Sequence, residues 1–316
     1  MNDIANDIRK ETEKIMKERS SQNEKREKLL KIGLTNSDIQ QLFFAERLAK
    51  KIAKKEREAA RQVVEDTIED ILSRYTFGVE IECCNARPSE LINSAIRHGL
   101  NMHQEGYNHR DNETYYKLVS DSSICGNNPI ECVSPILNGG NVGFNSLKAC
   151  CESLNEIGAN VNKSTGLHIH VGGTITDEQY VNTFINYACL QRIVDKFMSP
   201  SRRNGRWAKS YVGSYGRLLT AHTPQDVLEI LNHDRYHSVN PCSWSRHHTI
   251  EFRQHAGTTD YKKISMWAKF CIKLVHFSAT HRLQQYVTSV DEIEFLDDNE
   301  KAYFKSRIEV LSQLGV

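Results

Sequence analysis

Three stretches far apart in the sequence alternate apolar and polar residues one by one, and this pattern restricts the fold more than any other feature. They are TFGVEIE (76–82), GLHIHVG (166–172) and HTIEFRQ (248–254). Successive side chains of a β-strand point to opposite faces, so each stretch is expected to form a strand with one apolar and one polar face. The chain should therefore contain a sheet with a buried apolar side and a second side that carries ionisable groups.

The ionisable side of this predicted sheet gathers residues from several strands. A single glutamate on a strand usually faces solvent, but the same alternation on several strands favours one shared polar surface. A fourth stretch, IECVS (130–134), adds a further glutamate, and LVSDSS just before it adds an aspartate. The residues expected on this surface are Glu80, Glu82, Glu131, His168, His170, Glu251 and Arg253, with Asp121 nearby.

This set of residue types predicts a metal site. Clustered carboxylates repel one another unless divalent cations neutralise them. Oxygen-rich ligand sets favour Mg²⁺ or Mn²⁺, and Mg²⁺ usually brings substrate phosphates with it. Arg253, two residues from Glu251 on the same face, would offer a forked donor to a phosphate oxygen. Glu80 and Glu82 are therefore predicted to hold two neighbouring metal ions.

The order of the predicted elements favours an α+β fold. Helices and strands do not alternate one for one, which points to a largely antiparallel sheet rather than a doubly wound parallel one. The predicted strands are 75–83, 114–120, 129–134, 166–172 and 248–254. The predicted helices are 88–99, 144–157, 177–198, 224–232, 261–281 and 299–313.

Residues 1–74 have a different composition from the rest of the chain. They contain 17 basic and 15 acidic residues, no proline and one glycine, Gly33. This composition predicts a charged helical extension, followed by the main domain at 75–316. The basic stretch KKIAKKER (50–57) is typical of a solvated helix face, and phosphate contact is the alternative. The extension is expected to pack on the main domain, to form a homo-oligomer or to bind a partner.

Overall charge and cysteine content exclude several classes of protein. The chain has 41 Lys and Arg against 40 Asp and Glu, so its net charge of +1 selects neither nucleic acid nor membrane as a partner. Its apolar runs fall far short of the roughly 20 residues that span a bilayer. Nine cysteines occur without a C-x-x-C motif, and the N-terminus lacks the apolar core of a secretory signal. Reduced thiols in a cytoplasmic protein are expected.

The motifs together resemble a known enzyme family. The matching segments are TFGVEIE, DSSICGNNPIECVSP, STGLHIHVG, RYHSVN and TIEFRQHAGTTD, in this order from residue 75 to about 270. They resemble the amidoligase family of bacteria and phages, within the carboxylate–amine ligase superfamily of glutamine synthetase and glutamate–cysteine ligase. The resemblance implies a glutamine synthetase-like domain with a curved, mainly antiparallel sheet that binds ATP and Mg²⁺ or Mn²⁺.

The resemblance also implies roles for individual residues. Glu80, His168 and Glu251 resemble ligands of a metal that bridges the ATP phosphates. The metal beside the carboxylate substrate would be held by Glu82, which is also a candidate catalytic residue, and by Glu131 and Asp121. Arg253 and Arg235 would steady the transferring phosphoryl group, and His170 has no assigned role. The basic loop 199–216 is the candidate for closing over the site, where Arg202, Arg203 and Arg206 could bind an acidic substrate or the nucleotide.

The implied reaction is amide-bond formation. A substrate carboxylate attacks the γ-phosphate of ATP, and an amine then attacks the acyl phosphate. The carboxylate and the amine could belong to an amino acid, a peptide or a related amine. Two alternatives remain: a zinc hydrolase built on His168 and His170, and a ligase-like scaffold without catalysis whose interaction arm is 1–74. A nucleic-acid role through residues 50–57 would show as binding that weakens with salt.

Overall fold

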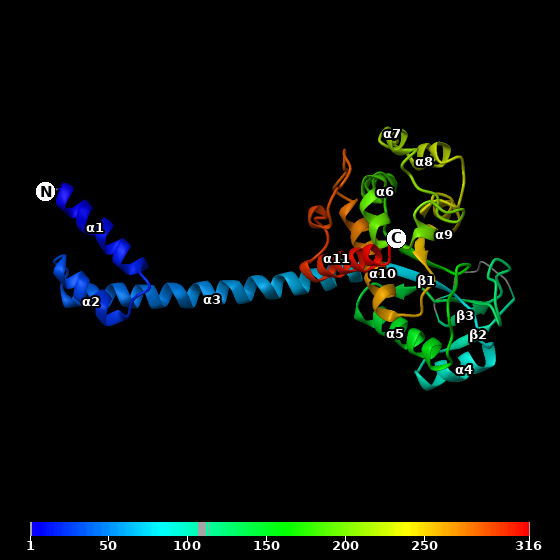
Figure 1. Ribbon diagram of the computed structural model, residues 1–316, viewed down its shortest axis with the longest axis horizontal. Helices are drawn as coiled ribbons and strands as arrows, with labels where there is room; N and C mark the ends of the chain where they lie inside the picture. The colour runs from blue at the N-terminus through cyan, green and yellow to red at the C-terminus, as the bar shows by residue number, and fades with distance from the viewer. Residues whose placement is uncertain (1, 107–111, 113, 316) are drawn as a thin grey trace. The chain divides into compact units, whose positions relative to one another are not determined.

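A computed structural model describes residues 2–106, 112 and 114–315, without the side chains of 2–8, 53 and 55–67. The chain forms two compact units, Met1–Thr67 and Ile68–Val316, coloured along the chain in Figure 1. The division falls inside a helix, α3 (Asn36–Ser73). The last turns of this helix belong to the second unit, because Leu72 is buried in its core and Ile68 packs against that core.

The first unit is helical. Two further helices, α1 (Asn2–Lys17) and α2 (Gln22–Lys31), share a small core with the first part of α3, built on Ile15, Leu29, Ile39 and Phe43. Ser21 begins α2 with a capping box, which satisfies backbone donors at the helix start. Of the basic stretch 50–57, Lys50 and Lys51 are exposed, and the side chains of 53 and 55–57 lie outside the described residues.

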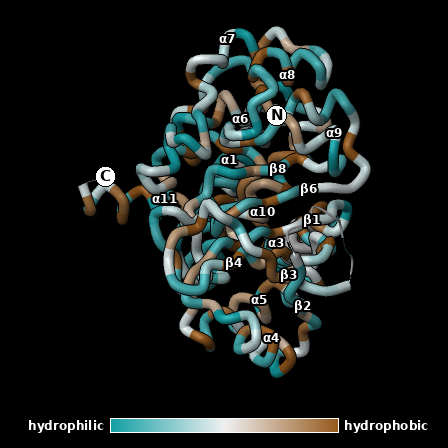
Figure 2. Tube along the Cα trace, turned by 90° about the vertical axis from the view of Figure 1, so that its right-hand side faces the viewer, coloured by the Kyte–Doolittle hydropathy of each residue, from teal (hydrophilic) through white to brown (hydrophobic). Residues whose placement is uncertain are grey.

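The second unit contains an eight-stranded sheet in the described part of the chain, with the order β2-β3-β4-β1-β6-β8-β7 and β5 paired to β1. Figure 2 shows the labels β8, β6, β1, β4, β3 and β2 in this order from top to bottom. Among the described pairings, β2 with β3 is parallel and the others are antiparallel. The strands are β1 (Tyr75–Cys83), β2 (Met102–Gln104), β3 (Tyr116–Val119), β4 (Ile130–Val133), β5 (Leu137–Asn138), β6 (Gly166–Gly173), β7 (Val239–Asn240) and β8 (Ile250–Ala256).

This arrangement confirms the predicted mixed α+β class with a mostly antiparallel sheet. The five predicted strands and six predicted helices all appear within a few residues of their expected bounds, while the short strands β2, β5 and β7 were not predicted. The helices are α4 (Pro88–Arg97), α5 (Asn141–Glu156), α6 (Asp177–Phe197), η1 (Pro200–Arg202), α7 (Tyr215–Leu218), α8 (Pro224–Ile230), α9 (Ser243–His247), α10 (Tyr261–Phe277), η2 (Val290–Glu292) and α11 (Asp298–Gln313).

Helices cover the apolar face of the sheet. On β1, Phe77, Val79 and Ile81 are each 1% exposed, as the alternation predicted. Phe77 stacks on a ring of α5, and on β8 Phe252 meets rings of α6 and α10. Burial of these large side chains, each worth about 2 kcal/mol, fixes which face of each strand points away from the helices. The polar face is left free for the site.

The alternation on β8 is interrupted by a β-bulge. Leu167 of β6 pairs with His255, whereas Ile169 pairs with Phe252, so β8 has one residue more than its partner over this interval. Gln254 faces the helices, where it bonds Asp195 and Tyr187 of α6. His255 also faces the helices, beside a tryptophan of α10. Ahead of the bulge, the strand keeps its polar residues on the other face.

None of the described helices combines the length and the apolar character that a bilayer crossing requires.

Candidate active site

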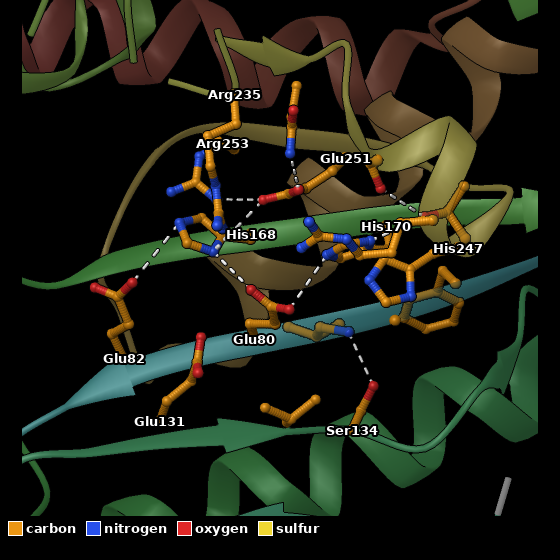
Figure 3. A pocket seen from close by; sticks show the side chains of 18 of the residues that line it. Glu80, Glu82, Glu131, Ser134, His168, His170, Arg235, His247, Glu251 and Arg253 are labelled. Atoms are coloured by element: carbon orange, nitrogen blue, oxygen red, sulfur yellow. Dashed lines mark hydrogen bonds and ion pairs between the residues drawn. The ribbon is translucent and has the colours of Figure 1, made fainter. Parts of the chain in front are cut away.

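A cavity of about 610 Å³ opens on the polar face of the sheet (Figure 3). Residues of β1, β3, β4, β6 and β8 form its floor. The segments around 121–123, 134–136, 202–207 and 235–249 contribute further lining, together with Asn112 and Ser164. The structure thus brings nearly all the predicted site residues together. Those that line the cavity are Glu80, Glu82, Asp121, Glu131, His168, His170, Arg235, Glu251 and Arg253.

Strand register explains why these side chains converge. Glu80 of β1 pairs with His168 of β6, and Glu82 pairs with Glu131 of β4. On the other side of β6, His170 pairs with Glu251. Directly opposed residues of antiparallel strands point to the same face with their Cβ atoms about 5 Å apart. Three neighbouring strand pairs therefore place their ionisable residues in one continuous row.

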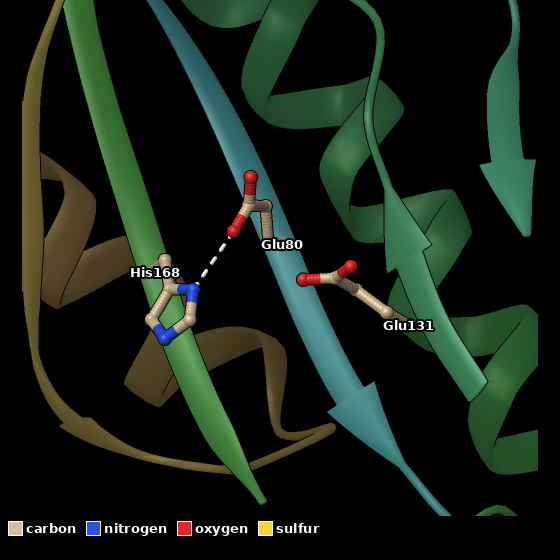
Figure 4. A group of neighbouring side chains, drawn as sticks. All are labelled: Glu80, Glu131 and His168. Atoms are coloured by element: carbon tan, nitrogen blue, oxygen red, sulfur yellow. Dashed lines mark hydrogen bonds and ion pairs between the residues drawn. The ribbon is translucent and has the colours of Figure 1, made fainter. Parts of the chain in front are cut away.

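Glu80 is at the centre of this row. Its Oε2 lies 2.8 Å from His168 Nδ1, and its Oε1 lies 3.3 Å from His170 Nε2. Burial raises the pKa of Glu80, but the charge of His170 and the hydrogen bond with His168 outweigh it and hold this pKa well below its usual value. Glu80 is therefore ionised, and Figure 4 shows it between His168 and Glu131.

Glu131 has the opposite electrostatic surroundings. It is 9% exposed, and the charges of Glu80, Glu82 and Asp121 act on it. Burial first, and then these like charges, raise the pKa of Glu131 well above its usual value. Glu82 is held in place, since its Oε2 accepts a hydrogen bond of 2.6 Å from the backbone N–H of Gly166. The carboxyl groups of Glu131 and its three acidic neighbours repel one another when ionised, and a bound cation would reduce this repulsion.

The side chains fit divalent metal ions. Three groups of three residues each offer ligand atoms that all lie within 4.8 Å of one another. Carboxylate oxygens dominate, with one imidazole in two of the groups, which is the donor set of Mg²⁺ or Mn²⁺ rather than of a thiolate zinc site. The groups are Glu80–Glu131–His168, Glu80–His170–Glu251 and Glu82–Asp121–Glu131.

Glu251 and Arg253 form a buried ion pair beside this row. They are 4% and 6% exposed, and Arg253 NH1 donates to Glu251 Oε1. The other carboxylate oxygen accepts 2.6 Å from Asn240 Nδ2 on β7. Burial raises the pKa of Glu251, but Arg253 more than compensates and the pKa falls to about 2. The Nε of Arg253 is buried without a hydrogen-bond partner.

His170 is linked to a chain of hydroxyls. Its Nδ1 lies 3.0 Å from Thr249 Oγ1, which lies 3.0 Å from Ser243 Oγ. Its Nε2 approaches Glu80 at 3.3 Å without the alignment of a hydrogen bond. The hydroxyls fix the ring orientation, so this side chain is positioned to support Glu80. The alternation of β6 predicted the direction of His170, but not its partners.

The loop 199–216 is attached to the rest of the unit near its middle. Lys209 N donates to Tyr236 O at 2.8 Å, and the buried Tyr211 donates its hydroxyl to Val239 O. Arg202 is buried and lines the cavity, whereas Arg206 is exposed, lies with its guanidinium 4.8 Å from the ring centre of Trp207, and is not part of the lining.

Several lining residues were not identified from the sequence. Tyr236 and Asn240 lie in short or irregular segments, where no periodicity indicates which way a side chain points. Thr249 falls on the polar face of the predicted strand 248–254, as Glu251 does, but its contact with His170 was not predicted.

The zinc alternative would need histidines besides His168 and His170. His247 and His248 also line the cavity, while His255 packs behind the sheet against Trp267.

Comparison with known proteins agrees with this geometry. Residues 73–275 match the sequence model of a family described as "putative amidoligase enzyme". No curated protein matches the chain. The matched region contains every strand of the sheet and every residue of the ionisable row. Because the match covers well over half of the chain, the protein belongs to this putative amidoligase family.

Proposed function

We propose that the protein is an ATP-dependent carboxylate–amine ligase, which forms an amide bond through an acyl phosphate. The observation that carries this proposal is the row of ligand groups around Glu80 and Glu131, which lies beside Arg253 in a single cavity. Carboxylate-rich metal sites next to an arginine are suited to phosphoryl transfer, where catalysis is mostly positioning and charge neutralisation. Membership of an amidoligase family supports a ligase at the coarse level.

Each residue has a role in this proposal. Glu80, His168 and Glu251 hold one Mg²⁺ or Mn²⁺, and Glu82, Glu131 and Asp121 hold another. When bound, these ions supply positive charge that neutralises phosphate and carboxylate oxygens. Arg253 offers its fork to the transferring group. Arg235, which lines the cavity and is exposed, has the freedom to contact a phosphate.

The superfamily, the substrates and the cellular location are proposed from the resemblance of the motifs and from the chemistry of the reaction. We assign the sheet to the glutamine synthetase-like superfamily because the order of its polar residues follows that pattern. The substrates are an amino acid or peptide carboxylate and an amine. We propose a cytoplasmic location, which the free cysteines of the second unit and the proposed use of ATP support. The helical first unit is proposed as the surface for a homo-oligomer or a partner, since its small core serves no part of the cavity.

Thermal unfolding tests this function. The protein is compared alone, with Mg²⁺, with ATP, and with both, and ADP release is then measured with mixed carboxylates and amines. A ligand at about 100 times its Kd adds about 2.7 kcal/mol of stability, a shift of a few degrees. A shift that requires both components is expected for the parent and for the exposed control Glu178→Gln, but not for Glu80→Gln.

Other outcomes would reject the proposal. A shift with Zn²⁺ alone, together with hydrolysis that needs no ATP, would favour the zinc hydrolase. If no ligand shifts the transition and no ADP is released, the cavity does not bind nucleotide and a scaffold role is favoured.

A further inference from the structure

One end of the cavity contains a buried arginine that lacks an anionic partner. Arg202, at the end of η1, is 5% exposed and lines the cavity. Its NH2 donates to Thr165 O at 2.6 Å. Both terminal nitrogens lie about 3.1–3.2 Å from the point where a Cβ on Gly166 would stand, so a larger residue there would press against the guanidinium. Among the described residues, no carboxylate lies within 4.0 Å of its guanidinium.

A buried guanidinium without a carboxylate is unusual, because the cost of removing its charge from water is normally offset by an anion. Glu82 is the acidic residue whose charge acts on Arg202, and Arg253 adds a like charge. If Glu82 holds a metal ion, its charge is already neutralised. Arg202 is then left to bind an anion that enters the cavity, and a planar carboxylate matches its fork.

Two aromatic side chains line the same cavity as Arg202, and one of them lies near Arg253. The rings of Trp207 and Tyr236 meet edge to face, 5.0 Å between centres, and both residues line the cavity. Arg253 Cζ lies 5.9 Å from the centre of the Tyr236 ring. Trp207 remains 37% exposed, although the backbone bond from Lys209 to Tyr236 holds its loop in place. A rigid, exposed indole at a cavity is suited to stacking on a planar ligand.

We propose that Arg202, Trp207 and Tyr236 form the carboxylate-substrate subsite and select an aromatic or heteroaromatic carboxylate. Arg202 binds the carboxylate beside the metal ligands Glu82 and His168, and the two aromatic residues pack against the ring of the substrate. This inference rests on the proposed ligase function. It goes further, because it names the class of carboxylate and the residues that recognise it.

A matched set of small carboxylates tests the subsite. Phenylacetate, cyclohexylacetate and phenylacetamide differ by aromaticity or by charge, and hydroxylamine serves as the amine. With Mg²⁺ and ATP, a carboxylate and hydroxylamine give a hydroxamate, ADP and phosphate. We expect kcat/KM for phenylacetate to exceed that for cyclohexylacetate by about threefold to tenfold, and phenylacetamide to be inert. Equal rates for the two carboxylates would overturn the proposed selection.

Variants separate the two parts of the subsite. Trp207→Ala, at an exposed position, should remove the preference for the aromatic acid while KM for ATP stays unchanged. Arg202→Gln should raise KM for both acids by about tenfold or more. Arg217→Gln, a matched change at an exposed arginine outside the cavity lining, is the control. If Trp207→Ala raises KM for ATP instead, the two aromatic side chains bind the nucleobase and the proposal is wrong.

Direct binding distinguishes failure of the subsite from failure of the ligase function. Saturation-transfer NMR of phenylacetate is measured on the full chain with Mg²⁺ but without ATP, for the parent, Arg202→Gln and Arg217→Gln, each checked for an unchanged unfolding temperature. A signal that is present in the parent and the control but lost in Arg202→Gln supports the subsite even if no hydroxamate forms with any acid. Absence of both binding and turnover overturns it.

Discussion

Glu82 on β1 and Glu131 on β4 stand directly opposite each other in an antiparallel pair. Like charges at opposed positions destabilise a sheet, and here Asp121 approaches both. Burial and the neighbouring charges raise the pKa of Glu131, which favours its neutral form and eases the repulsion between the two side chains. A divalent cation bound here would relieve the repulsion among these carboxylates and so stabilise the fold.

The first prediction concerns Glu131→Gln. Glutamine has the same shape without the charge, so the metal-free variant should unfold at the same temperature as the parent or slightly above it. The stabilisation by Mn²⁺ should fall, because one ligand oxygen is lost from two of the three groups. Thermal unfolding with and without Mn²⁺ measures both effects. A metal-free variant that unfolds several degrees lower would show that Glu131 is structural.

The same variant gives a pH prediction. Because the pKa of Glu131 is raised in the folded protein, its contribution to stability is present below the unfolded value of 4.5 and is lost as the pH rises through the folded value. Without metal, Glu131→Gln should therefore gain stability relative to the parent as the pH increases. Urea unfolding at several pH values measures this difference, and a gap that narrows with pH would contradict the assignment.

The second prediction concerns Glu251→Gln. This change leaves the buried Arg253 without its carboxylate, and breaking a buried ion pair typically costs about 3 kcal/mol or more. The double variant with Arg253→Gln should recover part of the loss, since no unpaired charge remains. Urea unfolding of both single variants and of the double variant gives the coupling energy. Purely additive losses would show that the pair does not act as a unit.

The third prediction concerns Thr249, which orients His170. Thr249→Val keeps the shape but removes the hydroxyl that lies 3.0 Å from His170 Nδ1. Outer partners of this kind typically change metal affinity by about tenfold or more, so Mn²⁺ binding should weaken by at least that factor. Thr249→Ser retains the hydroxyl and is the matched control. Calorimetric titration with Mn²⁺ compares the two, and equal affinities would remove His170 from the support of Glu80.

The fourth prediction concerns His255, behind the sheet. Its Nδ1 lies 2.7 Å from Ala256 O, and burial lowers its pKa from 6.5 to about 4. The neutral ring therefore contributes stability above pH 6.5 that is lost as the pH falls toward 4, about 2 kcal/mol by pH 5. His255→Phe should show a smaller loss between pH 7.5 and 5 in urea unfolding. Parallel pH profiles would show that another group causes the decline.

Much of the ionisable row could be predicted because strand alternation indicates the direction of each side chain. Once Phe77 and Val79 are buried, Glu80 must face the other way, and the same argument places His168 and Glu251. The sequence does not specify register, so the opposition of Glu82 and Glu131 required the structure.

The remaining parts of the cavity depend on contacts between distant segments. Arg202 lies in a basic loop that could equally face solvent, and its burial follows from Thr165, Gly166 and the strand they begin. Asn240 is placed by the pairing of the short strand β7 with β8. Tyr236 is placed by the backbone hydrogen bond that Lys209 donates to it. Such pairings leave no periodic pattern in the sequence.

The bulge on β8 separates the Glu251–Arg253 ion pair from the last residues of the strand. Glu251 and Arg253 precede the extra residue, while Gln254 and His255 follow on the helix side. The extra residue therefore lets two consecutive polar side chains, Gln254 and His255, lie on the helix side, while the residues that follow the bulge still pair with β6.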